Sequence, residues 1–287
     1  MKNIFKYILS LSILTLVSCE EVIDLDLPSK EPRLVVEANL DYDSDSDQPQ
    51  DFEFKLTKSG SFYDALIHPA TNAKVYIEHE QFGIINFEEE GETGIYKGKD
   101  IPLIQPFDKL TLHIEYNGES YKAIETYIPN NSTPFSITQN KKALFGEEYY
   151  EVTLNFKDSI DDSNNDKSLN YYLVERKRND TKSQIHIQNN DLTKGNTLKS
   201  IYLDEDSKVN DTIRFNHYKI SKTNFHYLRM IIESINNGGG PFQVPVGKIK
   251  GNVLNTTNPD KPALGYFRIT KKHTLSHIIY EQEISDK

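Results

Sequence analysis

The sequence is poor in the residues that most often carry chemistry. It holds one cysteine, two methionines and no tryptophan among 287 residues. A single cysteine cannot form a disulfide within the chain or build a cysteine-based metal site. Basic residues are outnumbered by acids, 33 against 43, which gives a formal net charge of −10. Because nucleic-acid binding needs a basic surface to neutralise phosphates, we expect no nucleic-acid partner.

Long hydrophobic runs are also missing. The apolar stretch at residues 7–17 has 11 residues, about half of the ~20 that span a bilayer. Two lysines precede this stretch, and the small Ser18 and then Cys19 follow it. This order resembles a bacterial lipoprotein signal peptide, so we expect residues 1–18 to be removed and Cys19 to be acylated. An ordinary secretory peptide with an incidental cysteine, or a short buried helix, is the alternative.

Acylation of Cys19 would anchor the protein in a membrane without a transmembrane helix. It would also consume the only thiol, which excludes cysteine catalysis. Removal of the signal peptide takes away two lysines and no acid, so the formal net charge becomes −12. Residues 19–31 follow as an acidic tether. Its acids crowd the positions directly after the cysteine: Glu20, Glu21, Asp24 and Asp26.

Acidic residues at this place resemble the export signal that sends lipoproteins of the Bacteroidota, which are Gram-negative, to the outer face of the outer membrane. We therefore favour a surface-exposed location in the outer membrane over its periplasmic face. A spacer that is merely solvated is the alternative.

From Arg33 onward, apolar and polar residues alternate, which predicts half-buried antiparallel strands. The clearest are residues 34–36, 52–56, 73–77 and 110–116. Asn117-Gly118 predicts a two-residue hairpin turn before a further strand. About seven short strands in roughly 100 residues are typical of an immunoglobulin-like or transthyretin-like β-sandwich. We expect this sandwich over residues 32–130, where a polar segment bounded by prolines follows.

Residues 131–287 are predicted to form a second β-rich domain. Its expected strands are residues 150–156, 170–176, 183–188, 198–203, 212–220, 264–270 and 274–280. One helix is expected near residues 221–236, where apolar residues recur at helical spacing after the candidate N-caps Ser221 and Thr223. A glycine run and Pro241 end it. The fold class is therefore mainly β.

Residues 41–47 are the nearest approach to a metal site. Three aspartates stand at alternate positions: Asp41, Asp43 and Asp45. A calcium loop needs glycine at its sixth position and glutamate at its twelfth, but this chain has Ser46 and Phe52 there. We expect a solvated loop, with calcium binding at extracellular concentrations as the alternative.

Other candidate chemistry is weaker. His273 and His277 lie in a predicted strand, where residues four apart are about 13 Å from each other. The acidic runs at residues 88–90 and 161–162 do not establish the spacing of about 5–9.5 Å that glycoside hydrolysis requires. No Gly-x-Ser-x-Gly motif and no phosphate-binding loop occur. The sequence predicts no catalytic residue, no cofactor and no metal site.

Separated segments carry a family resemblance. They read Cys-Glu-Glu-Val-Ile-Asp-Leu at residues 19–25 followed by Leu-Val-Val-Glu at 34–37, then Gly-Gly-Pro-Phe-Gln-Val-Pro at 239–245, Gly-Asn-Val at 251–253 and Leu-Gly-Tyr-Phe at 264–267. Together they resemble the domain of unknown function 4249 family of Bacteroidota lipoproteins. Family members usually read Gly-Asn-Pro-Phe where this chain reads Gly-Gly-Pro-Phe, so Gly240 replaces an asparagine. The resemblance implies a two-domain β architecture, a cell-envelope location and association with TonB-dependent outer-membrane receptors.

These observations lead to one functional expectation. We expect a non-enzymatic, lipid-anchored outer-membrane accessory or ligand-binding protein that partners an outer-membrane β-barrel protein, a TonB-dependent transporter. The loop Gly239, Gly240, Pro241 and Phe242 is expected to close the second domain, with docking of the partner as its alternative role. A surface adhesin or structural envelope component, and an envelope glycan or peptide hydrolase, are the competing functions.

Overall fold

The structure, a computed structural model, describes residues 31–60, 66–144, 147–158, 169–236 and 249–284. Over these residues it contains sixteen strands and one helix, which confirms the mainly β prediction. No helix among them is long and apolar enough to cross a membrane. Cys19 and the loop at residues 239–242 lie outside the described residues.

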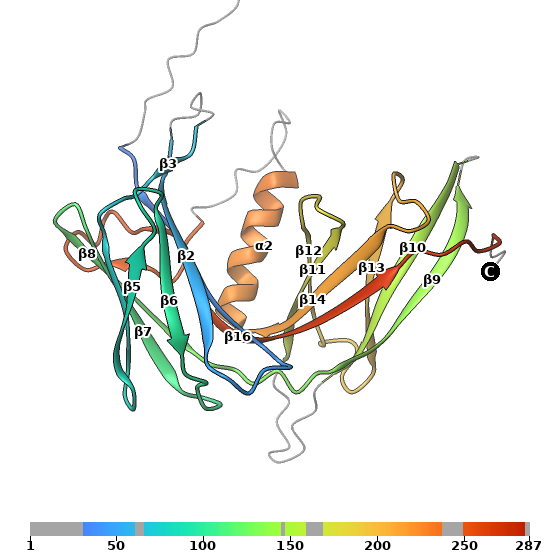
Figure 1. Ribbon diagram of the computed structural model, residues 1–287, viewed down its shortest axis with the longest axis horizontal. Helices are drawn as coiled ribbons and strands as arrows, with labels where there is room; N and C mark the ends of the chain where they lie inside the picture. The colour runs from blue at the N-terminus through green and yellow to red at the C-terminus, as the bar shows by residue number, and fades with distance from the viewer. Residues whose placement is uncertain (1–30, 61–65, 145–146, 159–168, 237–248, 285–287) are drawn as a thin grey trace, which may run out of the picture.

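The first half of the molecule is a β-sandwich (Figure 1). One layer holds β1 (Leu34–Asp43), β2 (Gln50–Lys58) and β6 (Ile95–Ile101), and the other holds β5 (Gly83–Glu89), β4 (Lys74–His79), β7 (Lys109–Tyr116) and β8 (Glu119–Thr126). The short β3 (His68–Pro69) pairs with β2, and β15 (Leu254–Asn255) pairs with β8. The sheet bends between the two layers, where the end of β5 pairs with β6.

Alternation of burial confirms the period-two pattern in this half. Along β7 every second side chain from Leu110 to Ile114 is buried in the core. The predicted hairpin follows directly, because β7 pairs with β8 from Tyr116 opposite Glu119. Asn117 and Gly118 have φ of 49° and 76°, as the two-residue turn requires.

The second half is also built of two layers. β12 (Gln184–Asn189), β11 (Tyr171–Arg178), β14 (Thr212–Ile220) and β16 (Leu264–Ile278) lie side by side, and β13 (Thr197–Asp204), β10 (Glu147–Lys157) and β9 (Pro134–Leu144) form a three-stranded sheet. A second core, with Leu154, Phe156 and Phe215 at its centre, fills the space between them.

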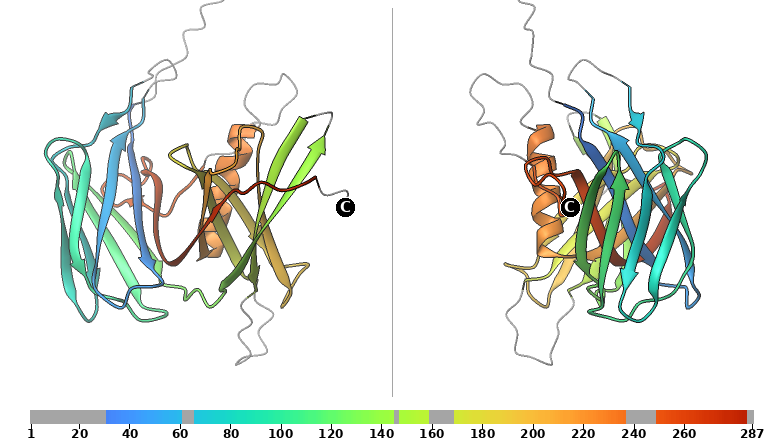
Figure 2. Two further views of the ribbon diagram at one scale, coloured as in Figure 1. Left: turned by 45° about the vertical axis from the view of Figure 1, so that its right-hand side comes forward. Right: turned by 90° about the vertical axis from the view of Figure 1, so that its left-hand side faces the viewer.

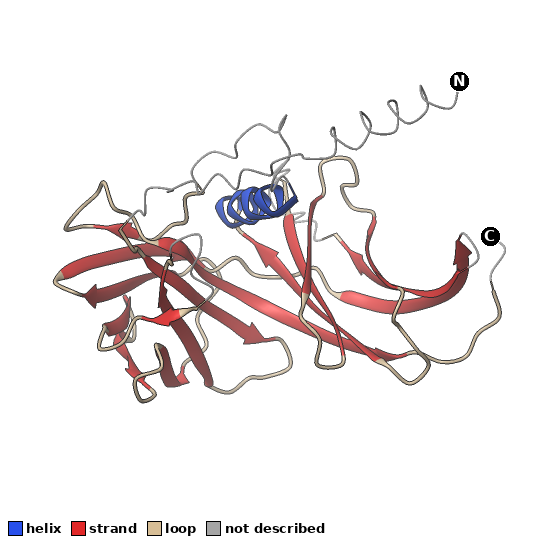
Figure 3. Ribbon diagram, turned by 90° about the horizontal axis from the view of Figure 1, so that it is seen from above, coloured by secondary structure: helices blue, strands red, loops and turns tan. Residues whose placement is uncertain are grey.

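The helix, α2 (Lys222–Asn236), forms as predicted. Its N-cap is Ser221, whose Oγ accepts a hydrogen bond from the backbone N–H of Asn224 at 3.2 Å. Phe225 packs against Tyr171 of β11, while most of the helix surface is only partly covered. Figures 2 and 3 show α2 on one side of the strands, between the two halves.

One long strand joins the halves. β16 runs as a single strand of 15 residues, where the sequence predicted two shorter stretches separated near Lys271. Its first part pairs in parallel with β1, from Val35 opposite Leu264, and its second part pairs antiparallel with β14. The strand continues through Lys271 because β1 pairs with one edge of β16 as far as Lys272, where β14 begins to pair with the opposite edge. Figure 1 shows β16 crossing beneath α2.

Residues beyond the expected boundary at residue 130 complete the first core. Val253, Ala263, Phe267 and Ile269 are buried among the side chains of the first sandwich. The core of residues 32–130 is therefore finished by a segment that returns from the end of the chain.

Candidate functional site

The three aspartates of the acidic loop do not converge. Asp41 is held by Arg268, whose Nε lies 2.9 Å from Oδ1 and whose Nη2 lies 2.5 Å from Oδ2. Asp43 Oδ1 instead accepts the backbone N–H of Asp45 at 3.1 Å. In the part of the chain that the structure describes, no group of three His, Cys, Asp or Glu residues could hold a metal ion.

The two histidines of β16 are used separately. His273 Nε2 lies 3.3 Å from the backbone oxygen of Asn130, and His277 Nε2 lies 2.9 Å from Gln139 Oε1. A third histidine, His217, is completely buried and lies 3.3 Å through Nδ1 from Asn130 Nδ2. Burial lowers the pKa of His217 to about 3, so this ring is neutral in the folded protein and serves packing.

The family segments at residues 251–253 and 264–267 form a tight joint. The side chain of Asn252 and the backbone of Phe267 exchange two hydrogen bonds of 2.8 Å. Gly265 has φ of +99°, and a Cβ there would lie 1.9 Å from the backbone oxygen of Val36. A Cβ on Gly251 would lie 1.6 Å from the oxygen of Gly265. These glycines are needed because three backbone segments touch.

Glu125, at the end of β8, closes the same joint. Its Oε2 accepts the hydroxyl of Tyr266 at 2.8 Å and lies 3.4 Å from Ser221 Oγ and from Asn252 Nδ2. Burial raises the pKa of Glu125, and the hydrogen bond from Tyr266 opposes that rise. The carboxyl thus ties β8, β16 and the start of α2 together, which is a structural task.

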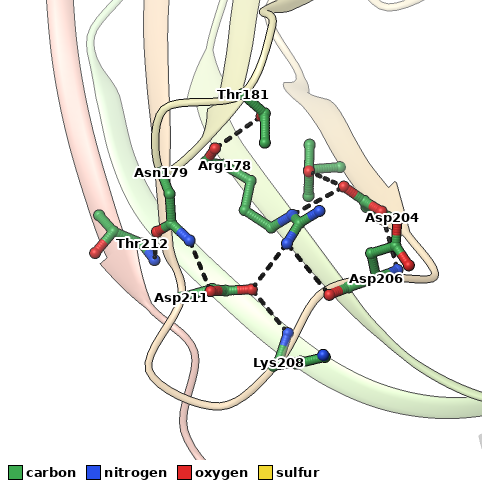
Figure 4. Close-up of polar contacts among 9 residues, drawn as sticks. Arg178, Asn179, Thr181, Asp204, Asp206, Lys208, Asp211 and Thr212 are labelled. Atoms are coloured by element: carbon green, nitrogen blue, oxygen red, sulfur yellow. Dashed lines mark hydrogen bonds and ion pairs between the residues drawn. The ribbon is translucent and has the colours of Figure 1, made fainter.

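A second polar network fixes the loops at one end of the second half (Figure 4). Arg178 donates to Asp204 at 3.0 Å and to Asp211 at 3.3 Å, and Asn179 Nδ2 donates to Asp211 at 2.7 Å. Burial alone would raise the pKa of Asp211, but hydrogen bonds from Lys208, Asn179 and Arg178 lower it overall. One guanidinium is shared by two carboxylates, and backbone and amide N–H groups satisfy the remaining carboxylate oxygens, so the network braces the loops.

A different arrangement occurs where β4 turns into β5. The ring of His79 is buried, and its Nδ1 accepts the backbone N–H groups of Gln81 at 3.2 Å and Phe82 at 3.3 Å. The proton is therefore assigned to Nε2, which lies 3.1 Å from Asp108 Oδ2. The same Oδ2 accepts the backbone N–H of Gln105 at 2.9 Å. His79 and Asp108 thereby lock the β4–β5 turn to the segment that leads into β7.

That segment holds a strained, exposed aromatic residue. The backbone N–H of Asp108 bonds to Gln105, and between them Phe107 has φ of +72° after Pro106. A turn of this kind favours glycine at the position of Phe107, and a left-handed conformation costs an L-residue about 1–2 kcal/mol. Phe107 is nevertheless 66% exposed. Strain that presents a ring to solvent points to a function outside the fold.

The strained turn borders a cavity of about 340 Å³. We call it the distal pocket, and its lining residues are His79, Glu80, Gln81, Phe107, Asp108 and Lys109. The ring of Phe82 stacks on His79 with centroids 4.8 Å apart. No site was predicted among these residues from the sequence, where His79 is one of several scattered histidines, although Pro106-Phe107 places an aromatic residue at a turn position between two expected strands.

The distal pocket lies at the far end of the first half from the start of β1. β1, β2, β6, β5 and β4 pair antiparallel in succession, so β4 runs in the same direction as β1 and both end at the same edge. In Figure 1 this edge is the lower one, whereas β1 begins at the upper edge. The pocket is thus separated from the N-terminal entry by the length of β1, about 33 Å for ten residues.

Comparison with known proteins gives little beyond the family. No curated protein matches the chain. Among solved structures, the FN1-FN3 domains of chicken CNTN1 match at 14% identity and a TM-score of 0.22, over 68% of this chain and 61% of that one. A DUF4785 family protein from Legionella pneumophila matches at 10% identity and a TM-score of 0.22, over 65% of this chain and 52% of that one.

The chain thus spans less than two thirds of the length of either structure, and likenesses this distant carry no functional argument. The family match is far more extensive, since the family model described as Domain of unknown function (DUF4249) covers residues 20–276. This match confirms the resemblance carried by the segments at residues 239–245, 251–253 and 264–267. The chain belongs to the DUF4249 family.

Proposed function

We propose that this protein is a non-enzymatic, lipid-anchored outer-membrane protein that presents a ligand-binding site away from the membrane, as an accessory to a β-barrel transporter. The observation that carries the proposal is the placement of the distal pocket. It lies at the opposite end of β1 from the chain that leads back to Cys19.

The reach of the tether supports this orientation. Residues 19–31 span at most about 43–47 Å when fully extended, and β1 adds about 33 Å more. A protein held by acylated Cys19 would therefore carry the pocket some tens of ångströms from the membrane surface. Capture of a ligand before its transfer to a membrane partner suits such a distance.

A hydrolase finds less support at this pocket. His79 and Asp108 are paired as in many catalytic sites, but the second ring nitrogen of His79 already accepts two backbone N–H groups. A general base needs that nitrogen free to face its substrate. The pair therefore fits a role in bracing the two turns.

The accessory role is tested by purification from the native membrane. The lipidated protein with a C-terminal tag is isolated from detergent-solubilised outer membrane, beside a Cys19→Ala control, and companions are identified by mass spectrometry. We expect a stoichiometric β-barrel protein with the wild type and a loss of membrane retention with the control. A protein that is retained in the membrane but always purifies alone would contradict the accessory role.

An adhesin remains the second candidate, because the exposed Phe107 ring at the distal end suits attachment to a surface as well as capture of a soluble ligand. An adhesin would keep the Cys19 anchor and lack the β-barrel companion, so the same purification separates the two. Accessibility of the tag to antibody on intact cells then tests whether the protein faces outward.

A further inference from the structure

We infer that the distal pocket binds a sugar ring of a glycan. This inference rests on the proposed function, since it names the ligand of the same site. Three features carry it: an aromatic platform, polar groups that the protein leaves unused, and a rigid support beneath both.

The platform is the ring of Phe107. The turn holds this ring outward. The backbone N–H of Phe107 donates to the backbone oxygen of Tyr127 at 2.8 Å, and the backbone N–H of Tyr127 donates to the backbone oxygen of Asp108 at 2.9 Å. One face of a pyranose ring carries only C–H bonds, and such a face stacks on the flat, apolar surface of an aromatic ring. A fixed, exposed ring at the border of a cavity provides that surface at little cost in conformational entropy.

The polar groups around Phe107 are available. Glu80 and Lys109 are exposed, and neither side chain has a hydrogen bond or ion pair to any other described residue. Asp108 uses Oδ2 to bond to His79 and to the backbone of Gln105. Its Oδ1 has no hydrogen bond to another described residue. Other exposed charges in this half do form ion pairs, as in Lys74 with Glu115 at 3.2 Å.

The mixture of groups selects a neutral ligand. Lys109 donates hydrogen bonds, the carboxylates of Glu80 and Asp108 accept them, and Gln81 can do both. The two carboxylates disfavour an anion, and the ammonium of Lys109 offsets one of their two negative charges. Sugar hydroxyls both donate and accept, so they satisfy this set without a charge to compensate. The volume of about 340 Å³ lies near the lower limit for small-molecule sites and suits about one or two rings.

The support is the buried His79. Because its two nitrogens bond to both turns that form the pocket, the lining is organised before any ligand arrives. Sites held by such buried partners bind without first paying for their own ordering.

The test uses the soluble protein, with residues 1–18 removed and Cys19→Ala, in native gels cast with laminarin, dextran, levan, arabinogalactan or mucin, followed by calorimetry on any binder. We expect the wild type to be retarded by at least one of these glycans. Phe107→Gly removes the ring and suits the positive φ, so it should fold normally and bind at least tenfold more weakly. Phe135→Ala, at a phenylalanine of β9 that is 59% exposed, is the matched control and should bind as the wild type does.

Several outcomes would overturn the inference. Absence of retardation by every glycan in the series rejects a sugar ligand, and equal binding by wild type and Phe107→Gly rejects this site. Binding to a tryptic digest of casein instead of the glycans would keep ligand binding but reject the sugar. Co-purification of a β-barrel protein is read independently, so the accessory role survives or fails on its own evidence.

Discussion

The joint between the two halves and the distal pocket treat polar groups in opposite ways. At the joint, Glu125, Arg268 and Asn252 are buried or half-buried, and each is bonded to partners within the chain. At the pocket, the side chains of Glu80 and Lys109 are exposed and have no partner among the described residues. Burial of a polar group costs free energy unless the group is paired, so the bonded side chains of the joint serve the stability of the fold. The exposed side chains of the pocket are not used by the fold in this way.

The two regions also differ in how they use a positive backbone φ. Gly265 takes its positive φ where two backbones touch, and glycine is the residue that can do so without cost. Phe107 takes a positive φ at an open turn, where glycine would serve the fold better. The first position is adapted to stability and the second is adapted to presentation of a ring. Substitutions at the two regions should therefore differ in sign and in size.

The largest effect is expected from Gly265→Ala. The new Cβ would lie 1.9 Å from the oxygen of Val36, and the parallel pairing of β1 with β16 would have to open. We expect a loss of at least about 4 kcal/mol in the free energy of unfolding, measured by urea denaturation. Gly83→Ala is the control, because its φ is also positive but nothing lies within 4 Å of the added Cβ; it should cost about 1 kcal/mol. Equal losses in the two variants would show that the close contact is not important.

Arg268→Met should be the next most damaging change. It leaves Asp41 without its bidentate partner and removes the guanidinium that lies over the Tyr218 ring at 4.8 Å. Breaking a buried ion pair from one side costs about 3–5 kcal/mol, and adding Asp41→Asn should recover part of that loss. Lys74→Met breaks an exposed pair and should cost at most about 1 kcal/mol. Similar losses of unfolding free energy in Arg268→Met and Lys74→Met would contradict the distinction between the buried pair and the exposed pair.

Acid should weaken the second half through His217, which packs against Phe156 and Tyr172. Its pKa is about 3 in the folded protein against 6.5 ordinarily, so the unfolded chain binds more protons between these values. Stability from this residue is therefore present above pH 6.5 and is lost as the pH falls, by about 2 kcal/mol at pH 5. His217→Phe should flatten the slope of unfolding free energy between pH 7 and pH 5, relative to the wild type. An unchanged slope would show that other groups account for it.

The smallest effect is expected at the pocket. Phe107→Gly relieves a left-handed conformation worth about 1–2 kcal/mol and adds about 0.5–1 kcal/mol of entropy to the unfolded chain. The melting temperature should stay the same or rise slightly, the opposite of the result for Gly265→Ala. A loss of more than about 1 kcal/mol would mean that the ring of Phe107 packs against the fold and is not held out for a ligand.

Local patterns were sufficient to predict most elements. The alternation in residues 110–116, the Asn117-Gly118 turn and the helix after Ser221 all depend on neighbours within a few residues. The pairing of β1 with β16 does not, since it joins residues about 230 positions apart and leaves no periodic trace. The ion pair of Arg268 with Asp41 likewise joins residues that are 227 positions apart and leaves no local pattern.

The distal pocket could not be predicted from the sequence for a related reason. His79 sits at a regular strand position, and its meaning comes only from Asp108, 29 residues later. The glycines at residues 251 and 265 stand in the family segments, and a Cβ at either would collide with a neighbouring backbone. Which backbones they approach could be learned only from the fold.

The parallel pairing of β1 with β16 also determines how the molecule responds to pulling. If force enters through the N-terminal chain while a captured ligand holds the opposite end, the load runs along the axis of β1. Nine residue pairs with β16 and five with β2 then resist together in shear, and they cannot be peeled apart one at a time. A strand clamped on both edges would make this half a mechanically resistant link if the proposed membrane anchor and ligand act at its two ends.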